Sequence, residues 1–173
     1  MTFLEESYEL PVTPSNYTKF EDWETTKFRI LPSWMDTDCI VFYEYFDKSQ
    51  WENGKPVRSS NKFDETPWIQ PWQEPKEKWS FKVWNYNLEQ IQICSIGQKS
   101  IKEAIMNLIK DTDYGEPLWY DIKVKREWQQ LETKYWVLPW PVKDFDIDLT
   151  WKDKKIDWVT YLESGTECFL NVD

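Results

Sequence analysis

Apolar and polar residues alternate with a period of two over most of residues 79–137. Such alternation places successive side chains on opposite faces of a β-strand. The first strand of this region carries Trp79, Phe81 and Val83 on one face and Lys82, Trp84 and Tyr86 on the other. We expect the first face to be core. We expect the second, with aromatic rings beside a cation, to be a binding surface.

A helical pattern interrupts the alternation at about residues 98–111. Its apolar residues recur at the spacing of one buried helix stripe, formed by Ile101, Ala104, Ile105, Leu108 and Ile109. Ser100 and Glu103 have the spacing of a capping box, in which each side chain satisfies a free backbone N–H at the helix start. The helix separates two predicted hairpins, which turn near residues 85–87 and 127–130.

Five or six strands are predicted in all. Residues 27–31 and 39–46 add two strands that are rich in β-branched and aromatic residues. In the last hairpin Ile122 and Val124 share one face, while Lys123 and Lys125 share the other. A helix inserted after the third of five strands is the organisation of an OB-fold. The predicted fold is therefore mostly β, a five-stranded OB-fold barrel with one helix.

Three regions divide the chain, whose length of 173 residues suits a single domain. Residues 1–15 are expected to be an N-terminal extension, residues 16–143 the domain, and residues 144–173 an acidic C-terminal segment. Because that segment also holds apolar residues, it could form an extra strand or a tail that docks on another surface. Residues 47–75 contain prolines and small polar residues and predict a long loop. Aromatic and basic residues within this loop favour a functional one.

The amino-acid composition limits the kinds of chemistry that we expect of the protein. There are 13 Trp and no His, and aromatic residues make up 18% of the chain. The absence of His removes the usual general base and the His-containing zinc sites, so we predict no enzyme, no metal and no cofactor. Cys39, Cys94 and Cys168 stand far apart and are expected to be reduced thiols. The sequence shows neither a signal peptide nor a membrane span, which predicts a cytoplasmic protein without a membrane partner.

The formal net charge of −10 is unevenly distributed. Residues 76–136 hold 10 Lys and Arg against 9 Asp and Glu, whereas residues 1–75 hold 7 against 14 and residues 137–173 hold 4 against 8. At physiological salt, charges act over about 8 Å. The near-neutral central block is therefore compatible with a local phosphate-binding face.

Several short segments resemble one known family. They are residues 27–32 (KFRILP), 79–85 (WSFKVWN), 91–93 (IQI), 98–101 (QKSI), 114–117 (YGEP), 120–126 (YDIKVKR) and 132–135 (ETKY). In their order and spacing these segments resemble the single-stranded-DNA-binding proteins of tailed bacteriophages, which have an OB-fold, over residues 17–140.

The resemblance implies a protein of the host cytoplasm that coats and protects single-stranded DNA in replication, recombination and repair. It also implies that the acidic C-terminal segment recruits replication or recombination proteins and competes with DNA. The zinc element and the basic N-terminal arm of that family are missing here, so zinc and cooperative binding are not carried over. We expect a monomer or a weak homo-oligomer.

Single-stranded nucleic acid is held by aromatic rings that stack on bases and by cations that follow the phosphates. The candidate residues on the two hairpins are Lys82, Trp84, Tyr86, Lys123, Lys125, Arg126, Trp128, Lys134 and Trp136, and those in the loop are Trp51, Lys55, Arg58 and Lys62. The alternative for each is a core aromatic or a solvated lysine. Two other functions fit a Trp-rich acidic β-protein: a carbohydrate-binding module, or a phage structural or adaptor protein.

Overall fold

The computed structural model describes residues 15–46, 56–61, 74–129, 132–140, 154–165 and 168–171. Its elements, in chain order, are β1 (Thr25–Ile30), β2 (Cys39–Phe46), β3 (Pro56–Ser59), β4 (Lys76–Asn85), β5 (Gln90–Ile96), α1 (Lys99–Lys110), β6 (Asp121–Gln129), β7 (Glu132–Trp140), β8 (Lys154–Ile156), α2 (Trp158–Ser164) and β9 (Phe169–Asn171). The predicted mostly-β fold is confirmed, and so is a helix at about 98–111.

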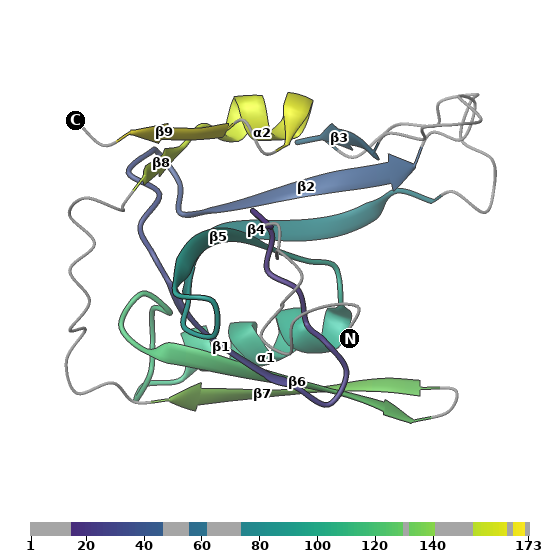
Figure 1. Cartoon of the computed structure of the whole chain (residues 1–173), viewed down its shortest axis with the longest axis vertical. Coiled ribbons are helices and arrows are strands. Elements are labelled where there is room, and N and C mark those ends of the chain that lie inside the picture. The colour runs from purple at the N-terminus through teal and green to yellow at the C-terminus, as the bar shows by residue number, and fades with distance from the viewer. Residues whose placement is uncertain are drawn as a thin grey trace, which may run out of the picture.

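The long strand β4 organises an antiparallel sheet of seven strands. One edge of β4 pairs with β5, while the other pairs first with β2 and then with β1. From β1 the sheet continues through β6 to β7. Figure 1 shows the upper strands curving over α1, with the β6–β7 hairpin below it. No sheet in the described part of the chain closes on itself, so the five-stranded barrel is not confirmed.

The main core lies between the sheet and α1. Ile101 and Ile105 of the predicted helix stripe are buried against Ile122 and Val124 of β6. Burial of each of these side chains stabilises the folded protein by about 1.5–3 kcal/mol. The face of β4 that was predicted to be core is largely so, since Phe81 and Val83 are buried and Trp79 is partly buried against the same cluster.

The predicted capping box is wrong. The N-cap is Gln98, which makes no side-chain capping hydrogen bond. Helix α1 therefore begins before Ser100, which lies inside the first turn instead of at its boundary. A capping hydroxyl must sit on the boundary residue, whose backbone is not yet helical.

Two predicted connections also differ from the structure. Glu127 and Trp128 were expected in a turn, but they belong to β6 and pair with Lys134 and Thr133 of β7. The predicted loop at 47–75 contains β3, which pairs with β2. Proline cannot donate a backbone hydrogen bond, but it is tolerated at the first position of a strand. Pro56 is the first residue of β3 and therefore does not prevent this strand from forming.

In the described residues, the C-terminal segment packs on the outer side of the sheet and contains two short paired strands, β8 and β9. Its apolar residues Ile156, Trp158 and Tyr161 form a second buried cluster with Phe42 of β2 and Ile93 of β5. Figure 1 shows β8, α2 and β9 above β2, on the side of the sheet away from α1.

Polar contacts fix this docked unit. The hydroxyls of Tyr161 and Ser80 lie 2.9 Å apart, and the Trp158 indole N–H donates to the Thr37 carbonyl at 2.9 Å. Asp157 caps α2 by accepting hydrogen bonds from the backbone N–H groups of Val159 and Thr160.

Neither helix in the described part of the chain has the length and apolar character needed to cross a membrane.

Replacing Tyr161 by Ala should lower the free energy of unfolding by about 3–5 kcal/mol, because the ring is fully buried between the C-terminal unit and the sheet. Val159→Ala is the matched control, since Val159 is exposed on the same helix; it should change stability by less than about 0.5 kcal/mol. Denaturant unfolding measures both. Equal, small effects would contradict the docking of this unit.

Candidate nucleic-acid interface

An aromatic and basic surface covers the outer side of the β6–β7 hairpin, facing away from α1. Alternation along the strands turns Ile122 and Val124 inward to the core, so their neighbours point outward. We call this surface the outer face; it consists of Lys27 of β1, Lys123, Lys125 and Glu127 of β6, and Lys134, Trp136, Leu138 and Trp140 of β7.

The outer face is open to solvent and hollowed. Trp136, Leu138 and Trp140 are all exposed. A depression of about 480 Å³ lies there, lined by Thr25, Lys123, Lys125, Glu127, Trp136, Leu138 and Trp140. Exposed apolar residues gathered on one surface commonly mark an interaction site.

Each exposed ring of the outer face has a charged group beside it. The Lys123 ammonium nitrogen lies 3.3 Å from the centre of the Trp140 ring, a cation–π contact. The Trp136 indole N–H donates to Glu127 Oε2 at 3.1 Å, and Lys125 Nζ lies 2.6 Å from Glu127 Oε1. The hydrogen bonds from Lys125 and then from Trp136 hold the pKa of Glu127 below its usual range. At neutral pH this carboxylate therefore stays ionised and orients both partners.

A buried ionic cluster supports one edge of the outer face. Asp121, the first residue of β6, is fully buried and accepts a hydrogen bond from Arg29 Nε at 2.6 Å. The Tyr86 hydroxyl donates to the same carboxylate oxygen at 2.9 Å, and Lys27 Nζ lies 3.0 Å from the other oxygen. Lys27 also lies 4.2 Å from the centre of the Tyr86 ring.

These contacts keep Tyr86 in place although it follows the last residue of β4. Burial, together with the hydrogen bond to Asp121, raises the pKa of Tyr86 above its usual value. The hydroxyl therefore remains a donor at neutral pH. Charge-assisted hydrogen bonds of this kind are about twice as strong as neutral ones.

The structure brings together five of the predicted site residues. Lys123, Lys125, Lys134 and Trp136 share the outer face, and Tyr86 is tied to its Lys27 edge. Lys27, Leu138 and Trp140 belong to the same surface but were not among the candidates. Trp140 continues the alternation of Trp136 and Leu138 along β7. The residue between Leu138 and Trp140 is Pro139, and proline usually argues against a strand.

Lys82 and Trp84 do not belong to the open surface, and their predicted exposure is wrong. They are 0% and 4% exposed. Lys82 Nζ donates to the Lys154 carbonyl at 2.6 Å and lies 5.9 Å from the centre of the Trp34 ring. Alternation correctly separates them from Phe81 and Val83, but the C-terminal unit and the segment after β1 cover that side of β4.

Arg126 and Trp128 lie on the other side of β6, because they share the alternation of Val124. Arg126 donates to the Phe20 carbonyl at 3.0 Å and pairs with Asp22 at 3.0 Å. Arg58 is also engaged elsewhere: it pairs with Glu44 at 2.8 Å and packs on Tyr161. Trp51, Lys55 and Lys62 lie outside the described residues.

Among the described residues, no group of three His, Cys, Asp or Glu side chains could hold a metal ion. Cys94 and Cys168 are buried and Cys39 is partly buried, all three as free thiols. Burial raises the pKa of Cys39 and of Cys168 to about 11, which leaves both thiols protonated at neutral pH. The chemistry that the outer face offers is ring stacking and cation contacts.

Replacing Asp121 by Asn should lower the free energy of unfolding by about 3–5 kcal/mol, because the buried Arg29 guanidinium would lose the negative charge of the carboxylate to which it donates. Glu103→Gln is the control. Glu103 pairs with Lys99 at 3.5 Å on the exposed side of α1, and losing such a pair costs about 0.3–0.5 kcal/mol. Denaturant titration of both variants tests this; an Asp121→Asn protein as stable as the control would contradict it.

Comparison with known proteins adds no relative. The chain matches no family model, no curated protein and no solved structure. We therefore infer the function of the chain from the geometry of the outer face.

Proposed function

We propose that the outer face binds single-stranded nucleic acid by stacking bases on β7 and holding phosphates on β6. The observation that carries the proposal is the pairing of an exposed apolar row, Trp136, Leu138 and Trp140, with the cations Lys123 and Lys125 on the next strand. Each base stacked on an aromatic ring contributes about 1–3 kcal/mol.

The strand geometry suits a nucleic-acid strand. Trp136 and Trp140 are four residues apart on one face, which separates their Cα atoms by about 13 Å. That spacing lets the two rings stack on different bases. The row of lysines lies on a strand about 4.8 Å away, within reach of the phosphates that join such bases.

The charge of the outward positions on β1, β6 and β7 favours an anion. Lys27, Arg29, Lys123, Lys125 and Lys134 provide five cations, against the carboxylates Asp121, Glu127 and Glu132. This local excess occurs in a chain with a formal net charge of −10. Because salt screens charges beyond about 8 Å, the local excess matters more to a bound phosphate than the total does.

We further propose that β1, β4, β5, β6 and β7, with α1 between β5 and β6, form an OB-fold. Such folds bind oligonucleotides on the face of their second and third strands and with the loops between strands one and two and between four and five. The corresponding face here, on β4 and β5, is covered by the C-terminal unit. Because that face is covered, we place the binding site on the β6–β7 hairpin. Its two strands are the fourth and fifth of the proposed OB-fold.

On this proposal, the connection between strands one and two spans residues 31–75 and includes β2 and β3. The contributions of Trp51, Lys55 and Lys62 remain predictions. The resemblance to phage single-stranded-DNA-binding proteins makes single-stranded DNA the expected ligand, in the host cytoplasm during replication, recombination and repair. Recruitment of replication or recombination proteins by the C-terminal segment also remains a prediction.

Trp136→Ala and Trp140→Ala should each weaken binding of a fluorescein-labelled oligo-dT by about 5- to 150-fold, the equivalent of one lost base stack. Trp128→Ala is a closely matched control, since Trp128 is 53% exposed and Trp136 is 54% exposed on opposite sides of the same hairpin. The control should bind within about two-fold of the unmodified protein. Fluorescence anisotropy measures all three.

Equal losses in Trp128→Ala and Trp136→Ala would overturn this assignment of faces. An absence of oligo-dT binding, together with quenching of Trp fluorescence by an oligosaccharide, would favour a carbohydrate-binding module instead. Binding of neither ligand would leave the adaptor function and refute the proposal.

Lys123→Ala should reduce the salt dependence of oligo-dT binding. For single strands, each phosphate contact contributes about 0.7 to the slope of log K against log salt concentration, so the slope should become shallower by about 0.7. Lys99→Ala, on the exposed side of α1, is the control and should leave the slope unchanged. Identical slopes in all three proteins would contradict a phosphate contact at Lys123.

A further inference from the structure

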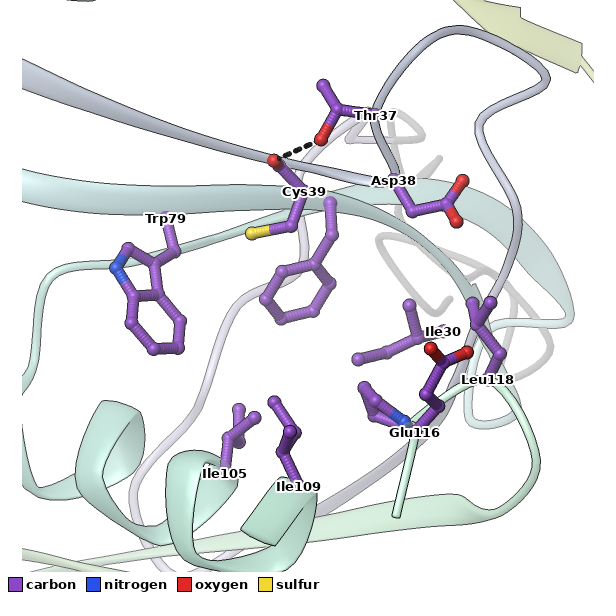
Figure 2. Close-up of a pocket in the computed structure, with 11 residues that line it drawn as sticks. Ile30, Thr37, Asp38, Cys39, Trp79, Ile105, Ile109, Glu116 and Leu118 are labelled. Carbon is purple, nitrogen blue, oxygen red and sulfur yellow. Dashed lines mark hydrogen bonds between the residues drawn. The ribbon is translucent and has the colours of Figure 1, made fainter.

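A second recess opens at the end of the main core, separate from the outer face. Its volume is about 340 Å³, near the lower limit of ligand pockets, which is about 300 Å³. Figure 2 shows it enclosed by the start of β2, the C-terminal half of α1 and the segment before β6. The residues around it are Ile30, Thr37, Asp38, Cys39, Trp79, Phe81, Ile105, Ile109, Glu116, Pro117 and Leu118.

The walls of the recess are apolar and remain partly exposed to solvent. Ile109, the last residue of the helix stripe, is exposed, and Trp79 and Leu118 are only partly buried. In Figure 2 the Trp79 ring, Ile105, Ile109 and Ile30 surround an open centre. Apolar surface left open in this way gains free energy when another apolar group covers it.

Carboxylates stand at the border of the recess. Asp38 and Glu116 line it, and within the described residues neither forms an ion pair with a Lys or Arg. Asp36, Asp111 and Asp113 are exposed in the two segments that supply those residues. The C-terminal end of α1 adds the negative end of the helix dipole on the same side, with Lys110 in its last turn. Lys102 lies toward Trp79 but pairs with Glu77 at 2.9 Å.

We propose that this recess binds a large apolar side chain carried by a basic segment of a partner protein. The apolar side chain would cover Ile109 and Trp79, while flanking Lys or Arg residues would lie near Asp38 and Glu116. A buried apolar group surrounded by charged contacts is the usual arrangement at the centre of a protein interface.

The charges select this partner over others. Nucleic acid would bring phosphates toward Asp38 and Glu116 and would be repelled, whereas a basic segment is attracted. The site shares no residue with the outer face, so the protein could hold a partner and a nucleic acid together.

The test uses the full chain and three fluorescein-labelled peptides. GKRLFKRG carries the apolar pair and the positive charges, GKRSSKRG keeps the charges alone, and GESLFSEG keeps the apolar pair alone. GKRLFKRG should bind about 10- to 100-fold more tightly than GKRSSKRG, because it buries Leu or Phe. It should also bind more tightly than GESLFSEG, which the carboxylates repel. Equal binding of GKRLFKRG and either of the other peptides would overturn the proposal.

Variants on one helix locate the binding site. Ile109→Ser should weaken GKRLFKRG binding by about ten-fold or more, whereas Met106→Ser, which changes an exposed apolar residue of α1 outside the recess, should not. Circular dichroism confirms that both variants fold. Equal effects of the two variants would overturn the proposal, and so would an unchanged affinity in the double variant Asp38→Asn, Glu116→Gln.

The thiol of Cys39 gives an independent readout, because it lines the recess while Cys94 and Cys168 are buried. Saturating GKRLFKRG should slow alkylation of Cys39 by N-ethylmaleimide, measured at mildly alkaline pH. An unchanged rate would overturn the proposal. Trp136→Ala should leave peptide binding intact, so failure of either site can be told apart from failure of the other.

Discussion

The buried carboxylate of Asp121 is the interaction on which the candidate interface depends. It receives Arg29 and Lys27 from β1 and Tyr86 from the turn after β4, and so ties two other parts of the chain to the first residue of β6. A buried charge is tolerated only when it is paired and hydrogen-bonded. This requirement fixes β6 beside β1, and alternation from Asp121 then turns Lys123 and Lys125 outward beside the rings of β7.

The outer side of the sheet is covered over some strands and open over others. On β4 and β5 the outer side is covered by the C-terminal unit, which buries Phe42 and Ile93 in a second apolar cluster. On β6 and β7 the same side stays open, with Trp136, Leu138 and Trp140 exposed. The C-terminal unit therefore limits the open surface of the sheet to the hairpin that carries the lysines, and a second recess at the end of the core is left for a different kind of partner.

The sequence was most informative where structure is local. Alternation correctly placed Ile122 and Val124 on one face of β6 and Lys123 and Lys125 on the other, and the apolar stripe predicted α1. It failed for Lys82 and Trp84, because alternation separates two faces without revealing what covers either of them. The cluster at Asp121 could not be predicted either, since its partner Arg29 is 92 residues away along the chain. Trp140 was not among the candidates because the alternation was followed only to residue 137, whereas β7 continues through Pro139 to Trp140.

The central claim is that nucleic acid lies on the outer face. Photo-crosslinking of the full chain to oligo-dT containing 5-iodo-deoxyuridine, followed by mass spectrometry of the digested complex, tests it most directly. We predict crosslinks at Trp136 and Trp140 and none at Trp84 or Trp158, which are buried. Crosslinks confined to the recess around Trp79, or spread without preference over exposed aromatic residues such as Trp128 and Trp119, would contradict the account.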